Sequence, residues 1–125
     1  MKGSAMIRRD DGASAVEFAL VLPILLALLM GILEFGWAFN GFITVTGAAR
    51  EGARIAAVDT SNDRVVEAVE NHTTIFDTSP TTTIDRGADS VTVEVRGALT
   101  PLVGFFRSTD WVITADATMR REYAN

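Results

Sequence analysis

Residues 12–42 read GASAVEFALVLPILLALLMGILEFGWAFNGF, and the chain continues as ITVTGAAREGARIAAV to residue 58. Between Glu17 and Arg50 the only charged residue is Glu34, so this run is too apolar to be one face of a soluble helix. At about 1.5 Å of rise per residue, the roughly 20 residues from 18 to 38 would cross a hydrocarbon core of about 30 Å. We therefore predict a helix over residues 13–58 that spans a membrane at about residues 18–38 and then projects beyond it.

The segment before the apolar run, residues 1–12, is short and polar, with three basic side chains against two acidic ones. Positive charge beside a first apolar segment holds that end in the cytoplasm, so the chain from about Thr46 onward is expected to be exported. A secretory signal peptide that is removed is the alternative. It is disfavoured because the apolar region is long, contains Glu34 and is not followed by a persuasive small-x-small cleavage site.

Composition narrows the classes of function. After the helix about 65 residues remain, enough for one small domain that needs another surface to complete its core. The net charge is −5 and both signs are interspersed after Arg50, which argues against a nucleic-acid-binding surface. The chain has no cysteine and a single histidine, His72, and it contains no phosphate loop, no paired nucleophile and no cluster of metal ligands. The sequence therefore predicts neither an enzyme nor a cofactor or metal site.

The apolar helix carries residues that affect its shape and packing. Pro23 has no N–H, so the carbonyl of Ala19 loses its usual partner and a bend or local loosening is expected there. Gly31, Gly36 and Gly41 permit close approach of backbones in a membrane. Helix partners are therefore expected, and a lone flexible anchor is the alternative.

Two carboxylates lie in this helix, and a charge within a membrane segment is by default a functional hypothesis because its insertion is costly. Glu17 is surrounded by apolar residues and is the sharper candidate. Glu34 lies near the far interface beside Trp37, where we expect an ordinary charge solvated at the level of the headgroups.

The sequence around Glu17 resembles a known family. Residues 11–18, DGASAVEF, followed by the apolar run, look like the processing site of class III signal sequences in type IV pilin-like proteins. Residues 15–39, together with AAREGARIAAV at 48–58, resemble the TadE-like pseudopilins of the tight-adherence (Tad/Flp) pilus system. The resemblance implies that residues 1–12 are a class III leader peptide, which a prepilin peptidase removes by cutting between Gly12 and Ala13 on the cytoplasmic side.

The same resemblance implies a role and partners. The chain is expected to be a minor pseudopilin in the bacterial inner membrane that acts in assembly of a Flp/Tad pilus for adherence, either in the membrane or incorporated into the fibre. Its implied partners are membrane lipid, the prepilin peptidase, the major Flp pilin, a TadF-like pseudopilin, and the assembly ATPase with its membrane platform. Cleavage would create an ammonium group on Ala13, and Glu17 of a neighbouring subunit could pair with it and select the helix register.

Two other interpretations stay open. The chain could be an unprocessed single-pass envelope protein with a small extracytoplasmic interaction domain, or a secreted domain whose apolar helix has been removed. The mass of the mature amino terminus distinguishes the three, because it differs between cleavage at Gly12, retention of Met1 and loss of the whole helix.

The projecting half of the helix has a face of small residues. Ala48, Gly52 and Ala56 recur every four residues, and a parallel row of alanines accompanies them. We expect a sheet or another helix to lie close against this face. Glu51 is placed to reach Arg54 at i,i+3 on a charged edge, which faces either solvent or a neighbouring subunit.

The remaining residues, 59–125, predict a small exported α/β domain. A short helix begins after a capping pattern of Thr60 and Asp63 and ends near Asn71. Residues 77–89 are rich in turn formers and are expected to be mainly loop, while residues 90–96 and 111–119 alternate as strands do. Residues 97–106 are apolar but broken by Gly and Pro, so we expect a loop that fills the core or touches the membrane. The predicted fold is α+β and pilin-like: a long membrane-spanning helix, a short helix and antiparallel strands.

Overall fold

The computed structural model describes residues 4–104 and 109–122, and for residues 4–11 it describes the backbone alone. The chain begins with one long helix, α1 (Ser4–Val58), of 55 residues. A short helix follows, α2 (Asn62–His72), and then three strands, β1 (Thr81–Arg86), β2 (Ser90–Leu99) and β3 (Trp111–Arg120). The predicted α+β, pilin-like architecture is confirmed: a long apolar helix, a short helix and an antiparallel sheet.

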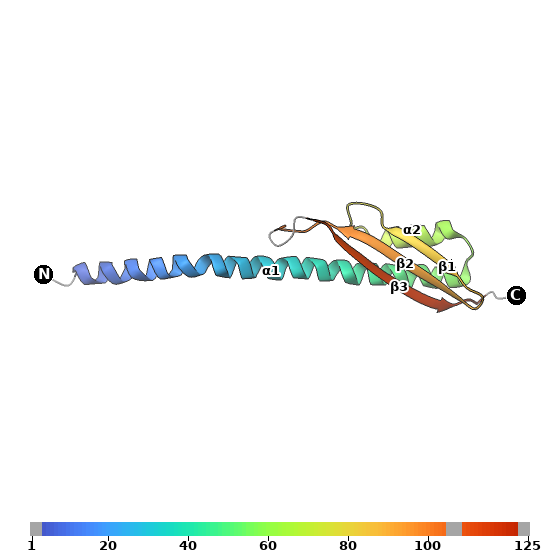
Figure 1. Ribbon diagram of the computed structural model, residues 1–125, viewed down its shortest axis with the longest axis horizontal. Coiled ribbons are helices and arrows are strands. Elements are labelled where there is room, and N and C mark those ends of the chain that lie inside the picture. The colour runs from blue at the N-terminus through green and yellow to red at the C-terminus, as the bar shows by residue number, and fades with distance from the viewer. Residues whose placement is uncertain (1–3, 105–108, 123–125) are drawn as a thin grey trace.

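Figure 1 shows that the amino-terminal half of α1 projects away from everything else, while its second half runs along the sheet and α2. The sheet has the order β1-β2-β3, and both strand pairs are antiparallel. Alternate residues of β2 face α1, so Val91, Val93 and Val95 are fully buried. Beside Val93 in the register lie Ile84 of β1 and Ala117 of β3.

The core is closed by the second half of α1. Six of the thirteen buried hydrophobic residues in the described chain belong to this helix: Val45, Ala48, Ala49, Ala53, Ala56 and Ala57. Their small side chains let α2 and the sheet approach the helix backbone closely. Residues 59–122 thus use α1 as the surface that completes their core, as a domain of this size requires.

Several boundaries differ from those expected. Residues 77–89 were expected to be loop, and this was wrong for Thr81–Arg86, which form β1. A backbone ladder with β2 holds these residues, although Ile84 is the only large apolar side chain among them. The strand expected at residues 90–96 extends to Leu99, because its last residues pair with Trp111 to Ile113 of β3. The rest of the expected 97–106 loop is described to residue 104.

The helix starts also differ in detail. α1 begins at Ser4 and therefore includes residues 4–12, and it continues through Pro23 without interruption. The expected cap of α2 by Thr60 and Asp63 is wrong: the N-cap residue is Ser61, and its side chain makes no capping hydrogen bond. Instead, the carboxylate of Asp59 accepts a hydrogen bond from the Ser61 N–H at 2.8 Å.

Candidate functional site

The exposed half of α1 carries the proposed processing residues. From residue 12 to residue 26 every side chain is exposed, and a Cβ added to Gly12 would meet no atom within 4 Å. Glu17 is likewise exposed and lies one helical turn beyond Ala13, so the two residues share a face of the helix. No hydrogen bond or ion pair of Glu17 is seen among the described residues, so its carboxylate is open to a partner.

This half of the helix is long and apolar enough to cross a membrane. The stretch Gly12–Val58 reaches a mean hydropathy of 2.6 in its most apolar window, none of which is buried within the chain. Large apolar side chains point outward around the helix, among them Phe18, Leu25 and Ile32, which are 49–61% exposed. Because such a surface is unfavourable in water, membrane anchoring is the role that this helix suggests.

The small-residue face of α1 lies inside the domain. Ala48 and Ala56 are fully buried, and Gly52 lies where α1, α2 and β2 meet. A Cβ on Gly52 would lie 3.0 Å from a methyl of Val69 in α2 and 3.1 Å from a methyl of Val93 in β2. The chain's own α2 and sheet therefore occupy this face, and a neighbouring subunit would have to use other surfaces.

The charged edge beside this face is formed by a pair on one helix turn. Arg54 Nε donates to the Glu51 carboxylate at 2.8 Å, as the i,i+3 spacing predicts. The hydrogen bond from Arg54 holds the pKa of Glu51 below its usual value. Since the Arg54 side chain is 62% exposed, this pair contributes little to stability.

Glu34 was expected to be a solvated charge at the level of the headgroups, and this expectation is wrong. Its side chain is buried, with 3% of the residue exposed. Its carboxylate accepts a hydrogen bond from the Val103 N–H at 2.9 Å. One turn further along α1, Trp37 Nε1 donates to the carbonyl of Thr100 at 3.0 Å. The segment after β2 is therefore fastened to α1 by two hydrogen bonds between groups more than 60 residues apart in sequence.

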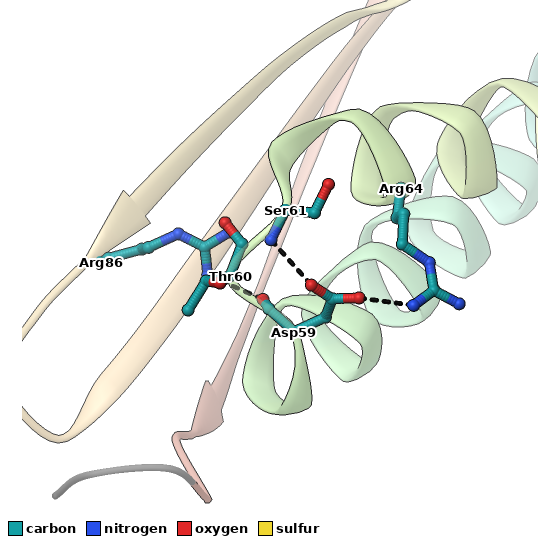
Figure 2. A network of polar contacts seen from close by, with 5 residues as sticks. All are labelled: Asp59, Thr60, Ser61, Arg64 and Arg86. Carbon is teal, nitrogen blue, oxygen red and sulfur yellow. Dashed lines mark hydrogen bonds and ion pairs between the residues drawn. The ribbon is translucent and has the colours of Figure 1, made fainter.

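The turn between α1 and α2 contains the densest polar network of the described chain. Arg86 of β1 donates to the carbonyls of Ala56, Asp59 and Thr60 and, at 2.8 Å, to the side chain of Asn62. Ala56 lies in the last turn of α1, and Asp59 and Thr60 follow the helix directly, so the arginine donates to carbonyls around its carboxyl-terminal end. Arg86 thereby joins the sheet edge to the turn (Figure 2).

Asp59 has a second role in the same network, because its two carboxylate oxygens have different partners. One accepts from the Ser61 N–H and the other from Arg64 at 2.7 Å, as Figure 2 shows. The Ser61 hydrogen bond and then Arg64 hold the pKa of Asp59 below its usual value. The network therefore orders the turn between the end of α1 and the start of α2.

Other chemistry-bearing residues are not brought together. His72 is exposed, and its Nδ1 lies 3.2 Å from the carbonyl of Ala68 within α2. Across residues 4–104 and 109–122, no three His, Cys, Asp or Glu residues are grouped so that they could hold a metal ion.

Comparison with known proteins gives one result. Residues 12–54 match the family model described as TadE-like protein. This match begins at Gly12, covers the exposed half of α1 and ends inside the small-residue face. No curated protein matches the chain, and no solved structure does either.

Proposed function

We propose, from the premise that this chain carries a TadE-like segment at residues 12–54, that it is a membrane-anchored minor pseudopilin of a Tad pilus system. The observation that carries the proposal is the extent of that match, which starts at the proposed scissile residue and spans the exposed apolar helix. The helix would anchor the subunit in the inner membrane, with the domain of residues 59–125 outside the cytoplasm. Its work would be physical: packing with other helices when a pilus or its initiating complex assembles.

Processing would begin at Gly12. The bond between Gly12 and Ala13 lies within α1, and a protease active site needs a locally unwound backbone. Glycine favours this, because a helical glycine is about 1 kcal/mol less stable than alanine. A dedicated prepilin peptidase is the proposed partner for this step, and open space around Gly12 supports access to it.

After cleavage, the charge on Ala13 would be paired. In an assembled bundle, Glu17 of one subunit would take the ammonium of its neighbour. A misplaced helix would leave charges unpaired in an apolar layer, which selects the register.

The partners at assembly would be the major Flp pilin, a TadF-like pseudopilin, and the assembly ATPase with its membrane platform. Since the small-residue face is already buried by α2 and the sheet, these contacts would use the apolar membrane half of α1. Gly31 and Gly36 lie there and allow close helix approach.

Two substitutions test the proposal, with the amino-terminal mass and co-purification with pilus components as readouts. Gly12→Leu should leave uncut precursor. Gly36→Leu is the matched control, because Gly36 is also exposed with no neighbour within 4 Å, and it should be cut normally. Glu17→Leu should be cut but should co-purify poorly.

Three outcomes would contradict the proposal. Cleavage of Gly12→Leu between residues 12 and 13 would show that the processing site is wrong. Wild-type co-purification of a processed Glu17→Leu would remove the charge-pairing mechanism. An uncut wild-type chain that retains Met1 would favour the alternative, an unprocessed single-pass envelope protein.

Topology is tested separately. Protease added to spheroplasts should digest the chain beyond Thr46, because basic residues before the apolar helix favour a cytoplasmic amino terminus. Protection of that domain, with cytoplasmic control proteins also intact, would overturn the orientation.

A further inference from the structure

The end of the domain that faces the projecting half of α1 carries an exposed apolar surface. We call it the lipid-contact patch, and it consists of Phe35, Phe39, Leu102, Val103 and Val112. These side chains come from α1, from the segment after β2 and from the start of β3, and they are 41–70% exposed. We propose that this patch is immersed in the outer headgroup layer of the membrane and contacts phospholipid acyl chains, which places the domain in the bilayer surface rather than above it.

The first argument is depth along the helix, and it rests on the proposed membrane anchoring of α1. With Glu17 at the cytoplasmic edge of the apolar layer, Glu34 lies about 26 Å and Trp37 about 30 Å further along the helix axis. A hydrocarbon core is about 30 Å thick. The hydrogen bonds from Val103 to Glu34 and from Trp37 to Thr100 fix the segment after β2 at this same level. This segment therefore cannot lie above the membrane unless the helix is lifted out of it.

The second argument is that polar groups at this level are paired with each other. A carboxylate, an indole N–H, a backbone N–H and a backbone carbonyl would each be costly to place in an apolar layer alone. The two hydrogen bonds join all four, and they leave the apolar side chains of Leu102 and Val103 on the outside. Because the Glu34 carboxylate is buried, the protein surface at this level of the helix is apolar even though the helix carries an acidic residue there.

The third argument is continuity with the membrane span. Beyond Trp37 the apolar surface of α1 does not end, because Phe39 and Phe42 are each more than half exposed. At about 33 and 37 Å from Glu17 they would fall in the outer polar layer, which extends some 5–7 Å past the core. A shallow apolar groove of about 380 Å³ runs between these rings and Trp111 and Val112 of β3. An acyl chain matches the chemistry of this groove.

Two exposed carboxylates set the outer limit of immersion. Asp77 accepts a hydrogen bond from the Thr100 hydroxyl at 2.7 Å, and Asp110 directly precedes β3. Both are at the same end of the domain as the patch, so they would lie among the headgroups. The domain is therefore seated at the boundary of the acyl region, and only the segment after β2, held at the level of Glu34 and Trp37, reaches into it.

The absence of cysteine from the sequence makes the test direct, because single cysteines can be introduced and spin-labelled in the full chain. The labelled protein is reconstituted into vesicles of phosphatidylethanolamine and phosphatidylglycerol. Collision of each label with oxygen, which dissolves in lipid, is compared with collision with a water-soluble nickel chelate. Leu102→Cys reports on the patch, Leu25→Cys on the membrane span, and Asp85→Cys on the opposite end of the sheet.

The labels at residues 25 and 102 should be accessible to oxygen and protected from the chelate, and the label at 85 should show the reverse. Val112→Cys repeats the patch measurement at a second exposed position. Chelate access at 102 and 112 with protection at 25 would overturn the lipid contact and leave anchoring intact. Chelate access at 25 would overturn both. Protection of 102 from both reagents that is lost on dilution would show that a second copy of the chain, and not lipid, covers the patch.

Discussion

Replacing Gly52 by leucine tests whether the close approach of α1, α2 and β2 stabilises the domain. A Cβ at this position already lies 3.0 Å from Val69 and 3.1 Å from Val93, and both valines are fully buried. Three further carbons would have to displace them, so we expect the upper part of the usual overpacking cost of about 1–3 kcal/mol. Leucine favours the helix over glycine by about 0.8 kcal/mol. The expected net loss in the free energy of unfolding is therefore about 1–2 kcal/mol.

The matched control is Gly47→Leu. Gly47 lies on the same helix outside the proposed span, but a Cβ there would meet nothing within 4 Å. This variant should gain about 0.8 kcal/mol from the higher helix propensity of leucine, without a steric cost. The difference between the two variants thus isolates the effect of packing at position 52.

Unfolding of the full chain in mild detergent provides the measurement. The only two tryptophans, Trp37 and Trp111, both pack against the domain core, so intrinsic fluorescence reports on its loss. For a domain of this size, each kcal/mol shifts Tm by roughly 4–8 °C. Equal Tm values for Gly52→Leu and Gly47→Leu would refute the reasoning, because they would mean that α1 is not held against α2 and the sheet.

Three further predictions concern polar contacts. Glu34→Leu should leave the Val103 N–H without its acceptor, at a cost of about 1–3 kcal/mol, so hydrogen exchange of the Val103 amide should accelerate. Glu34→Gln keeps an acceptor oxygen and should retain much of the protection. Unchanged exchange in both variants would contradict the contact. Arg86→Met should remove the guanidinium donors that join β1 to the α1–α2 turn and lower the midpoint of urea unfolding, with a loss of about 1.5–3 kcal/mol. An unaltered midpoint would show that the turn is ordered without them. Because the Ser61 hydrogen bond holds the pKa of Asp59 below its ordinary value of 3.8, the stabilisation from this carboxylate is present above that pH and is lost as the pH falls through the lowered pKa. Asp59→Asn should therefore weaken the acid dependence of Tm below about pH 4, and an identical pH profile would contradict this assignment.

The long helix and two of the strands could be predicted because their signals are local. An uninterrupted apolar run identifies α1, and strict alternation identifies β2 and most of β3. The strand β1 could not be predicted in this way, because Thr81, Thr82 and Thr83 bury little apolar surface and lie among turn formers. Its backbone is ordered by pairing with β2, which propensity along the chain does not record.

The outcome for Glu34 shows a different limit. Its neighbours in sequence favour an interfacial charge, and its actual partner, the Val103 N–H, is 69 residues away. The sequence held one weak indication of a shared polar contact: Glu34, which is acidic, and Trp37, which has an indole N–H, lie on one face of an apolar helix at i,i+3. By contrast, the burial of Ala48, Gly52 and Ala56 follows from a spacing that the sequence displays openly.

One mechanical consequence follows from α1 being both the anchor and part of the core. Val45 to Ala57 extend over more than three turns against α2 and the sheet, on the same continuous helix that carries residues 12–33. A pull on the sheet and α2 along the helix axis would act on these contacts in shear, and all of them would have to slip together before the helix could slide. Torque would be transmitted in the same way: a rotation of the projecting half of the helix by about 100°, the angle of one residue, would turn the whole sheet with it. A domain joined through a flexible linker would absorb either movement, whereas this one converts motion of its anchor directly into motion of its surface.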